Sequence, residues 1–306
     1  MVEYIKIARI DHWFKNVFML PGTALALIFT NIPFAEIMWP TTIGLLSVCF
    51  IASANYVINE WLDAEFDQHH PIKKNRSSVG NTNLTAKYVY IEYIIFIILG
   101  LSLGLLLPIE FMIFLIALLI MGVIYNVKPF RSKDKAYVDV LSESINNPLR
   151  LLLGWSAIVT GSLPPSSVLL AYWMGGAFLM AVKRYAEYRF IDDPERAALY
   201  RKSFIVYTEE RLLISSFFYA LSSTFFLGIF LIKYRVEFLL TFPLLALLFA
   251  WYLAIGQKPH SPTQNPEKLY TEKKFILYII SLCTVVILLF FIDIPWLQVL
   301  VERVEY

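Results

Sequence analysis

Residues 54–78 read ANYVINEWLDAEFDQHHPIKKNRSS, in which an apolar segment ends, four carboxylates follow within eight residues, and a basic run comes next. Asn55, Asn59, Asp63 and Asp67 are spaced by four, so on a helix each is turned by only about 40° from the one before it. We call this helix face the acidic stripe, and Glu60 lies at its edge. Polar groups repeated along one face of a membrane helix are costly unless they face a cavity. The stretch therefore predicts a helix that starts in the membrane and ends at a polar site.

The composition indicates that this helix belongs to an integral membrane protein. Of the 306 residues, 58% are hydrophobic and 16% are charged, whereas a soluble domain is about one quarter charged. The apolar residues form nine runs, each near the ~20 residues that cross a bilayer as a helix. These expected spans are 17–34, 41–60, 88–107, 109–127, 138–160, 167–182, 212–232, 237–255 and 275–293. We therefore expect an all-α integral membrane protein with nine transmembrane helices around a cytoplasm-facing cavity.

The chain is interpreted as a single transmembrane domain over residues 1–306, because no linker or internal repeat is evident. Residues 1–16 carry Lys6, Arg9 and Lys15, and we expect this amphipathic segment to lie at the membrane interface. The two cysteines, Cys49 and Cys283, fall inside expected spans and offer neither a disulfide framework nor the spacing of a metal site.

The basic residues are distributed very unevenly between the two sides of the membrane. The amino terminus carries three of them, and the loops after spans two, four, six and eight carry four, four, seven and four, which is 22 of the 26. The positive-inside rule therefore puts the amino terminus and these loops in the cytoplasm, at a cell (inner) membrane, and function is expected there. In the longest of these loops, Asp193-Pro194 is expected to open an amphipathic helix.

The acidic stripe has the ligand chemistry of a magnesium site. Mg²⁺ takes one or two carboxylates and completes its shell with water and substrate phosphates. The basic run that follows, HHPIKKNR at 69–76, supplies cations that can hold a phosphate directly. The alternative is an ordinary charged helix end with no ligand. Asn55 and Asn59 argue against it, because they lie deeper in the span than a solvated rim requires.

A second set of polar residues lies in the expected span 138–160. Asp139, Glu143 and Arg150 follow helical spacing there, and Pro148 is expected to loosen the helix and open it toward a cavity. Two interpretations stay open: a structural pair of Glu143 with Asn147 or Arg150, or a set of groups that face the site.

A third set, KRYAEYR at 183–189, ends the sixth span. Lys183 and Glu187 are four residues apart on one face, with Arg184 beside them. The set is either an anchor at the cytoplasmic interface or a phosphate-binding cluster that faces the acidic stripe.

The motif NEWLDAEFD at 59–67 resembles the Asn-Asp-x-x-Asp-x-x-x-Asp motif of the UbiA superfamily of membrane prenyltransferases, with Glu60 where Asp is usual. Within that superfamily the chain resembles the decaprenyl-phosphate phosphoribosyltransferase branch. ARIDHWFKN at 8–16 is similar to the branch's Arg-Pro-x-x-Trp-x-Lys-Asn opening, with Ile10 in place of Pro. HPIKKNR, YVDV, KRYAEYR and RKSFIVYTEERL also correspond, so the resemblance covers most of residues 8–215.

This resemblance implies a UbiA-like bundle and a Mg²⁺-dependent transfer of 5-phosphoribose. The donor would be 5-phosphoribosyl 1-diphosphate, the acceptor a polyprenyl (decaprenyl-like) phosphate, and the released group diphosphate. Asn59, Asp63 and Asp67 are implied as the catalytic, metal-holding set. The expected substrate-binding residues are Lys15, Asn16, Asn55, Glu60, Lys73, Arg76, Asp139, Arg150, Lys183, Arg184 and Glu187. A homo-oligomer in the membrane is one option, and no nucleic-acid partner is expected.

Two other functions are compatible with parts of this pattern. The first is transfer of a prenyl group from a prenyl diphosphate to an aromatic or quinone-precursor acceptor. Family members of that kind carry a second Asp-rich motif, and this chain has KRYAE at that position. The second is a transporter with a cation site, for which inverted repeats or broken helices and a site near the bilayer midplane are typical.

Overall fold

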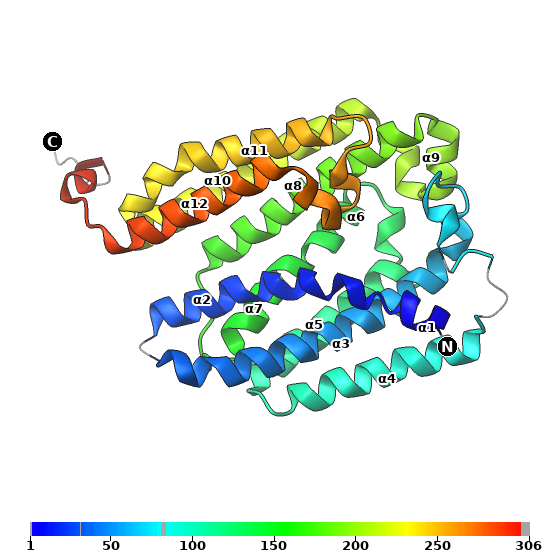
Figure 1. The fold of residues 1–306 in the computed structure, drawn as a ribbon, viewed down its shortest axis with the longest axis horizontal. Coiled ribbons are helices and arrows are strands. Elements are labelled where there is room, and N and C mark those ends of the chain that lie inside the picture. Colours follow the sequence, from blue (N-terminus) through cyan, green and yellow to red (C-terminus); the bar gives the residue numbers. More distant parts are fainter. Residues whose placement is uncertain (1, 31, 77, 81–83, 301–306) are drawn as a thin grey trace. The chain divides into compact units, whose positions relative to one another are not determined.

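The computed structural model describes residues 2–30, 32–76, 78–80 and 84–300, and within them it contains helices and no strand. The α-helices are α1 (Val2–Ile7), α2 (Leu20–Phe29), α3 (Phe34–Asp67), α4 (Ala86–Gly104), α5 (Ile109–Asn126), α6 (Val138–Ser144), α7 (Asn146–Ser156), α8 (Ser166–Ile191), α9 (Pro194–Tyr200), α10 (Glu209–Tyr234), α11 (Phe242–Gly256) and α12 (Lys273–Phe291) (Figure 1). The 3₁₀ helices are η1 (Ile10–Met19), η2 (Lys73–Asn75), η3 (Ser132–Asp134), η4 (Lys202–Ile205), η5 (Val236–Thr241), η6 (Pro262–Gln264), η7 (Pro266–Thr271) and η8 (Pro295–Leu300). The expectation of an all-α protein is confirmed for these residues.

Six helical segments of the described chain are long and apolar enough to cross a membrane. They are α3, α4, α5, α8, α10 and the segment Val236–Gly256 that joins η5 to α11. They match the expected spans two, three, four, six, seven and eight. The other three expected spans coincide with η1–α2, with α6–α7 and with α12. The number nine therefore stays a prediction.

The expected span 17–34 is not one continuous α-helix. Residues 10–19 form the 3₁₀ helix η1, and only the ten residues of α2 are α-helical. Pro21 lies in the first turn of α2, where its missing N–H costs no hydrogen bond. The expected helix over these residues was therefore wrong in its start and its length.

The expected span 138–160 is broken at Ile145 into α6 and α7. Pro148 accounts for the break, because it cannot donate to the carbonyl of Ser144 and its ring clashes with that carbonyl. The loosening that we predicted from Pro148 is thus observed, three residues ahead of the proline.

The chain divides into two compact units, each described here by itself. Unit 1 comprises Met1–Pro164 and Ile191–Thr208, and unit 2 comprises Pro165–Phe190 and Glu209–Tyr306. The interpretation as a single domain stays a prediction.

In unit 1, α3 packs against α4 and α5 around an apolar core. Val48 and Ile51 of α3 are buried with Phe111 and Leu115 of α5. The hydroxyl of Ser47 donates to the carbonyl of Gly100 on α4 at 2.8 Å. This packing fixes α3, so its last four turns present the acidic stripe in a defined orientation.

Helices α2 and α7 of unit 1 approach each other through glycines. A Cβ on Gly22 would lie 1.9 Å from the carbonyl oxygen of Leu151, and one on Gly154 would lie 2.0 Å from that of Met19. Both positions therefore require glycine, and the pair sets how closely the amino-terminal segment packs on α7.

Replacing Gly154 by Ala should destabilise the protein by about 1–3 kcal/mol, because the added methyl forces two backbones apart. Thermal unfolding of the purified protein in detergent measures this loss. Gly228→Ala in α10 is the matched control, because a Cβ there meets no atom within 4 Å. Equal unfolding temperatures for the two variants would contradict the close approach of α2 and α7.

In unit 2, polar contacts join α8 to α10 and α11 to α12. The hydroxyl of Ser223 donates to the carbonyl of Ala171 at 2.9 Å, and that of Tyr278 donates to the carbonyl of Leu244 at 2.7 Å. Phe178 of α8 lies against Phe249 and Tyr252 of α11. These contacts hold the helix that carries Lys183, Arg184 and Glu187.

Candidate active site

The acidic stripe lies at the end of α3, as predicted, and Asp63 is its most heavily contacted carboxylate. Its Oδ1 accepts hydrogen bonds from Lys133 Nζ at 2.5 Å and from Arg131 Nη2 at 3.0 Å. Its Oδ2 accepts from Asn59 Nδ2 at 3.1 Å. Asn126 ties this group together, since its Oδ1 accepts from Asn59 at 2.6 Å and from Lys133 at 2.8 Å.

Arg131 and Lys133 come from the segment that follows α5, and both are buried. The carbonyl of Asn126 accepts from Arg131 Nη1 at 3.1 Å, and Asp134 accepts from Arg131 Nε at 3.2 Å. Burial lowers the pKa of Lys133 to about 8, although the Asp63 carboxylate acts in the opposite direction. Lys133 is therefore a cation that loses its proton just above neutral pH.

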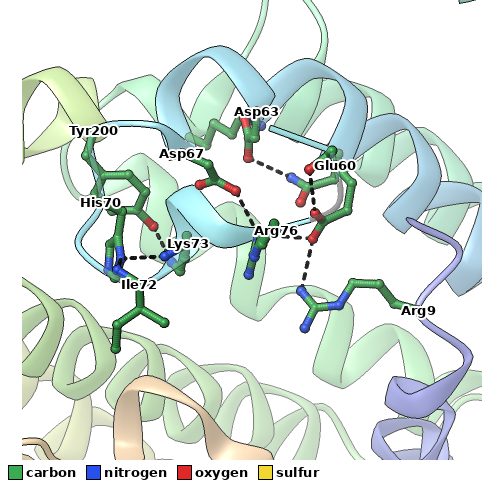
Figure 2. Close-up of polar contacts among 12 residues, drawn as sticks. Arg9, Glu60, Asp63, Asp67, His70, Ile72, Lys73, Arg76 and Tyr200 are labelled. Carbon is green, nitrogen blue, oxygen red and sulfur yellow. Dashed lines mark hydrogen bonds and ion pairs between the residues drawn. The ribbon is translucent and has the colours of Figure 1, made fainter. Parts of the chain in front are cut away.

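Arg76 bridges two further carboxylates of this helix end, Glu60 and Asp67 (Figure 2). Its Nη1 lies 2.9 Å from Asp67 Oδ2 and 3.0 Å from Glu60 Oε1. Burial alone would lower the pKa of Arg76, but Glu60 and Asp67 outweigh it and raise that pKa. Arg76 stays charged at any physiological pH, and one nitrogen of its guanidinium contacts both Glu60 and Asp67.

Lys73 and His70 of the basic run meet Tyr200 of α9. The ammonium of Lys73 donates to the Tyr200 hydroxyl, and the imidazole of His70 packs edge-on against the Tyr200 ring. The backbone N–H groups of Ile72 and Lys73 both donate to His70 Nδ1 at 3.1 Å. The predicted phosphate-binding run is therefore folded back on itself and tied to α9.

Helix α9 begins as predicted. The Asp193 carboxylate accepts hydrogen bonds from the backbone N–H groups of Glu195 at 3.0 Å and Arg196 at 3.2 Å, with Pro194 in the first turn.

The amino-terminal residues of the predicted site lie on η1. Arg150 Nε of α7 donates to Asn16 Oδ1 at 3.0 Å, and Asn16 Nδ2 donates to Cys49 Sγ at 3.2 Å. Lys15 Nζ lies 2.8 Å from Nδ1 of the buried His12. Arg150 and Asn16 are thus brought together as partners within unit 1, and their contact with substrate stays a prediction.

Two other predicted residues are engaged in packing. Asp139 is fully buried and accepts from the hydroxyls of Tyr207 at 2.7 Å and Ser203 at 3.2 Å. Asn55 Nδ2 donates to the carbonyl of Leu118 at 3.1 Å, and its amide lies against Gly122 of α5. Both side chains join segments of unit 1, and their role as substrate ligands stays a prediction.

The proposed pairs of Glu143 were Asn147 and Arg150. In the structure the hydroxyl of Tyr125 donates to Glu143 at 2.7 Å and Arg150 donates to Asn16 at 3.0 Å, and the expected pairs of Glu143 stay a prediction.

In unit 2, Arg184 and Glu187 are both buried on α8, with Arg184 Nη1 3.5 Å from Glu187 Oε2. Lys183 is half-buried beside them. Whether this cluster faces the acidic stripe stays a prediction.

A cavity of about 20 Å³ lies between Asp63, Asp67 and the cations around them. Its lining contains four cationic and three acidic side chains: Arg131, Lys133, Arg201, Lys202, Asp63, Asp67 and Asp134. A space of this size admits about one water-sized occupant. Among the described residues no three His, Cys, Asp or Glu side chains gather as a metal-ligating cluster. Asp63 and Asp67 are the two carboxylates of the acidic stripe in this lining, and Mg²⁺ takes one or two carboxylates when phosphates complete its shell.

Sequence reasoning missed Arg131, Lys133, Asn126, Arg9 and Tyr200. Arg131 and Lys133 were counted only as cytoplasmic charges in the loop after span four. The available signal was the segment YNVKPFRSKDK at 125–135, which puts two cations beside a polar helix end. No pattern in that segment says that its cations meet Asp63, because the contact joins residues 68 and 70 positions apart.

Comparison with known families assigns the chain to one of them. Residues 17–279 match the model of the UbiA prenyltransferase family. The chain belongs to this family. As a UbiA member in which six of the described helical segments can cross a membrane, it is a multi-pass membrane protein and an enzyme of the UbiA transferase type.

Curated UbiA relatives point to one branch of the family. The chain is 29% identical over 226 residues to decaprenyl-phosphate phosphoribosyltransferase of Mycolicibacterium smegmatis, a match that spans 72% of this chain and 66% of that protein. It is 28% identical over 227 residues to the Mycobacterium tuberculosis protein of the same name, across 72% of this chain and 70% of that one. These two proteins are what the chain is similar to among curated proteins.

Solved structures agree on the fold. A UbiA homolog from Archaeoglobus fulgidus bound to GPP and Mg²⁺ has a TM-score of 0.69 and 19% identity, across 92% of this chain and 99% of that one. The same homolog bound to Cd²⁺ has a TM-score of 0.65. At this identity the likeness concerns the UbiA fold alone.

Proposed function

We propose that this protein transfers 5-phosphoribose from 5-phosphoribosyl 1-diphosphate to a polyprenyl phosphate and releases diphosphate. The observation that carries the proposal is the cation-rich cavity at Asp63 and Asp67, where Lys133, Arg131 and Arg201 meet two carboxylates. The space itself admits an occupant of the size of a metal ion, which the carboxylates would hold, and the cations around it can hold phosphate oxygens of a diphosphate bound to that metal. The two mycobacterial relatives, named for this activity, support the choice of substrates.

The carboxylates of the stripe fit a magnesium ion. Asp63 and Asp67 would hold it, with Asn59 oriented toward Asp63 by its amide. When bound, the metal neutralises charge on the leaving diphosphate. The UbiA homolog from Archaeoglobus fulgidus was solved with Mg²⁺ and with Cd²⁺, which is consistent with a divalent ion in this fold.

The remaining chemistry falls to the chain's own cations. A phosphate oxygen of the lipid forms a bond to the anomeric carbon, and the bond from that carbon to diphosphate breaks, with the electron pair leaving on the diphosphate. The lipid phosphate is already ionised at neutral pH, so no general base is required. Lys133 and Arg131 stabilise the charge that develops on the departing group. Displacement inverts the anomeric carbon and yields a β-linked polyprenyl-phosphoryl ribose 5-phosphate.

The assignment of the other residues rests on the same chemistry. Lys73 and Arg76 of the loop after α3 and Lys15 of η1 are the proposed phosphate contacts in unit 1. Lys183, Arg184 and Glu187 of α8 are also proposed as residues that contact substrate. We also infer that the amino terminus and this site face the cytoplasm, in agreement with the basic loops.

A transfer assay tests the proposal. The purified protein is incubated with labelled 5-phosphoribosyl 1-diphosphate, Mg²⁺ and polyprenyl phosphates of several lengths, and the lipid extract is counted. A parallel reaction offers a prenyl diphosphate with aromatic acceptors. Label in a lipid that depends on Mg²⁺ supports the proposal. Product only in the parallel reaction would identify a prenyltransferase. No product in either reaction would favour the remaining alternative, a transporter with a cation site.

The pH profile of transfer gives a further prediction. The lowered pKa of Lys133 means that its amine is protonated below about pH 8 and neutral above it. kcat/KM for the sugar diphosphate should therefore fall as pH rises through about 8, since this quantity reports the ionisation of the free enzyme. Lys133→Arg should move the alkaline limb to higher pH, because a guanidinium keeps its proton. If the alkaline limb of the kcat/KM profile lies at the same pH in Lys133→Arg as in the wild type, the ionisation of Lys133 does not cause it.

A further inference from the structure

A second cavity of unit 1 lies beside the acidic stripe and has no role in the reaction as described so far. It has a volume of about 300 Å³, and its lining consists of charged side chains: Lys6, Arg9, Asp11, Glu60 and Arg76. Three of these carry positive charge and two carry negative charge. A lining without apolar residues suits a small, soluble anion rather than a lipid tail.

Glu60 forms the buried base of this cavity. It is 4% exposed, and its Oε1 accepts from Arg9 Nη1 at 3.1 Å and lies 3.0 Å from Arg76 Nη1. Its Oε2 accepts from Ser78 Oγ at 3.2 Å. Both oxygens are therefore engaged by donors of the chain, and Glu60 is an anchor for two guanidinium groups.

Arg9 is held in place before any ligand arrives. Its backbone lies in the left-handed region, with φ of 48°, which is uncommon for a residue other than glycine. Its Nη2 lies 2.5 Å from Nε2 of the buried His12, and its Nη1 is bound to Glu60 (Figure 2). A fixed guanidinium loses little conformational entropy when it binds a phosphate, so this arrangement favours binding.

Arg76 connects this cavity to the proposed diphosphate site. Its Nη1 reaches both Glu60 and Asp67, while the donors on its Nη2 and Nε bond to no described residue. Glu60 Oε1 and Asp67 Oδ2 lie 3.0 and 2.9 Å from that one nitrogen. Arg76 therefore lines this cavity and also contacts a carboxylate of the other one.

We propose that the cavity formed by Lys6, Arg9, Glu60 and Arg76 binds the 5-phosphate of the sugar donor, and that Glu60 is the positioning residue that holds Arg9 and Arg76 for it. The inference rests on the proposed function. The ligand group is a phosphate monoester, which the lipid acceptor also carries. The sugar is favoured because the lining offers no surface for a polyprenyl chain.

Inhibition of the transfer reaction separates the three phosphate groups. The inhibitors are ribose 5-phosphate, Mg–pyrophosphate and farnesyl phosphate, which report on the 5-phosphate, the diphosphate and the lipid phosphate. Arg9→Met should raise the inhibition constant of ribose 5-phosphate about tenfold or more, since a bond to a charged group is lost. The constants of the other two inhibitors should change less than about threefold, a difference below 1 kcal/mol. Lys87→Met is the control, because Lys87 is an exposed cation of α4 in the same unit and outside this lining.

Glu60 has its own test. Glu60→Gln should raise KM for the sugar diphosphate about tenfold with little change in kcat, because it weakens the hold on two guanidinium groups. Glu60→Asp keeps the charge and should recover part of the loss. A change in the Mg²⁺ requirement of Glu60→Gln would instead make Glu60 a metal ligand and overturn its assignment.

The outcomes are distinguishable from failure of the proposed function. If Arg9→Met weakens farnesyl phosphate alone, the cavity serves the lipid and the inference is wrong. If it weakens all three inhibitors equally, Arg9 is structural and the inference is again wrong, while transfer by the wild type still supports the function. If the wild type makes no labelled lipid, the function fails. Arg9-dependent binding of ribose 5-phosphate, measured by calorimetry, would then support a sugar-phosphate site independently.

Discussion

Asp63→Asn should reduce transfer from the sugar diphosphate by about 10³-fold, the scale of a lost electrostatic contact to metal or leaving group. The wild-type carboxylate is the centre of the site, because Lys133, Arg131 and Asn59 all donate to it. An amide cannot neutralise these cations or bind a divalent ion with the same strength. Initial rates at saturating Mg²⁺ measure the effect.

Two controls make the Asp63 result specific. Glu65→Gln makes the same chemical change two residues away on α3, where the side chain is exposed, and it should keep normal rates. Thermal unfolding should also be compared, since Asp63→Asn leaves Lys133 and Arg131 buried with less compensation. A folded Asp63→Asn protein with near-normal turnover would disprove the role of Asp63 in metal binding.

Lys133→Met should lower kcat/KM for the sugar diphosphate by about 100-fold, because it removes a buried cation that faces the small cavity at Asp63. Met has a similar length and no charge, and Arg131 still pairs with Asp63, so the fold should persist. Isothermal calorimetry with Mg–pyrophosphate gives a second readout, in which affinity falls together with kcat/KM.

The exposed Lys135 of the same segment provides the matched control, and Lys135→Met should behave as the wild type. The double variant Asp63→Asn/Lys133→Met should lose less than the product of the single effects, since the two side chains are in contact. Full additivity would mean that Lys133 and Asp63 act independently, contrary to the observed ion pair.

Much of unit 1 follows from local patterns in the chain. The four-residue spacing of Asn59, Asp63 and Asp67 predicts one helical face, and α3 extends to Asp67 with Glu65 exposed on another face. Asp193-Pro194 predicts a helix start, and Asp193 caps α9. These predictions succeed because helix periodicity and capping depend on residues within a few positions of each other.

The site itself depends on residues that lie far apart in the chain. Glu60 differs from the family's usual Asp by one methylene, and its sequence position suggested a metal ligand or substrate contact. Its partners are Arg9, which is 51 residues away, and Arg76 and Ser78. Asp63 meets cations from the loop after α5, and Asp139 is enclosed by Tyr207 and Ser203. No local sequence pattern relates any of these partners to its carboxylate, so the contacts could not be predicted from the sequence.

The amino-acid sequence alone was sufficient for the membrane class, the acidic stripe and the family motif, since each is a local property of composition or helical spacing. It was not sufficient to predict the contacts and the role of each charged side chain. That depends on which distant segments meet, and their meeting is decided by packing, such as the glycine contact of α2 with α7 and the core between α3 and α5. Burying a charge is costly unless it is paired, and the fold determines which partner lies near it. Tertiary structure therefore paired Asp63 with Lys133 and made Glu60 the anchor of Arg9 and Arg76.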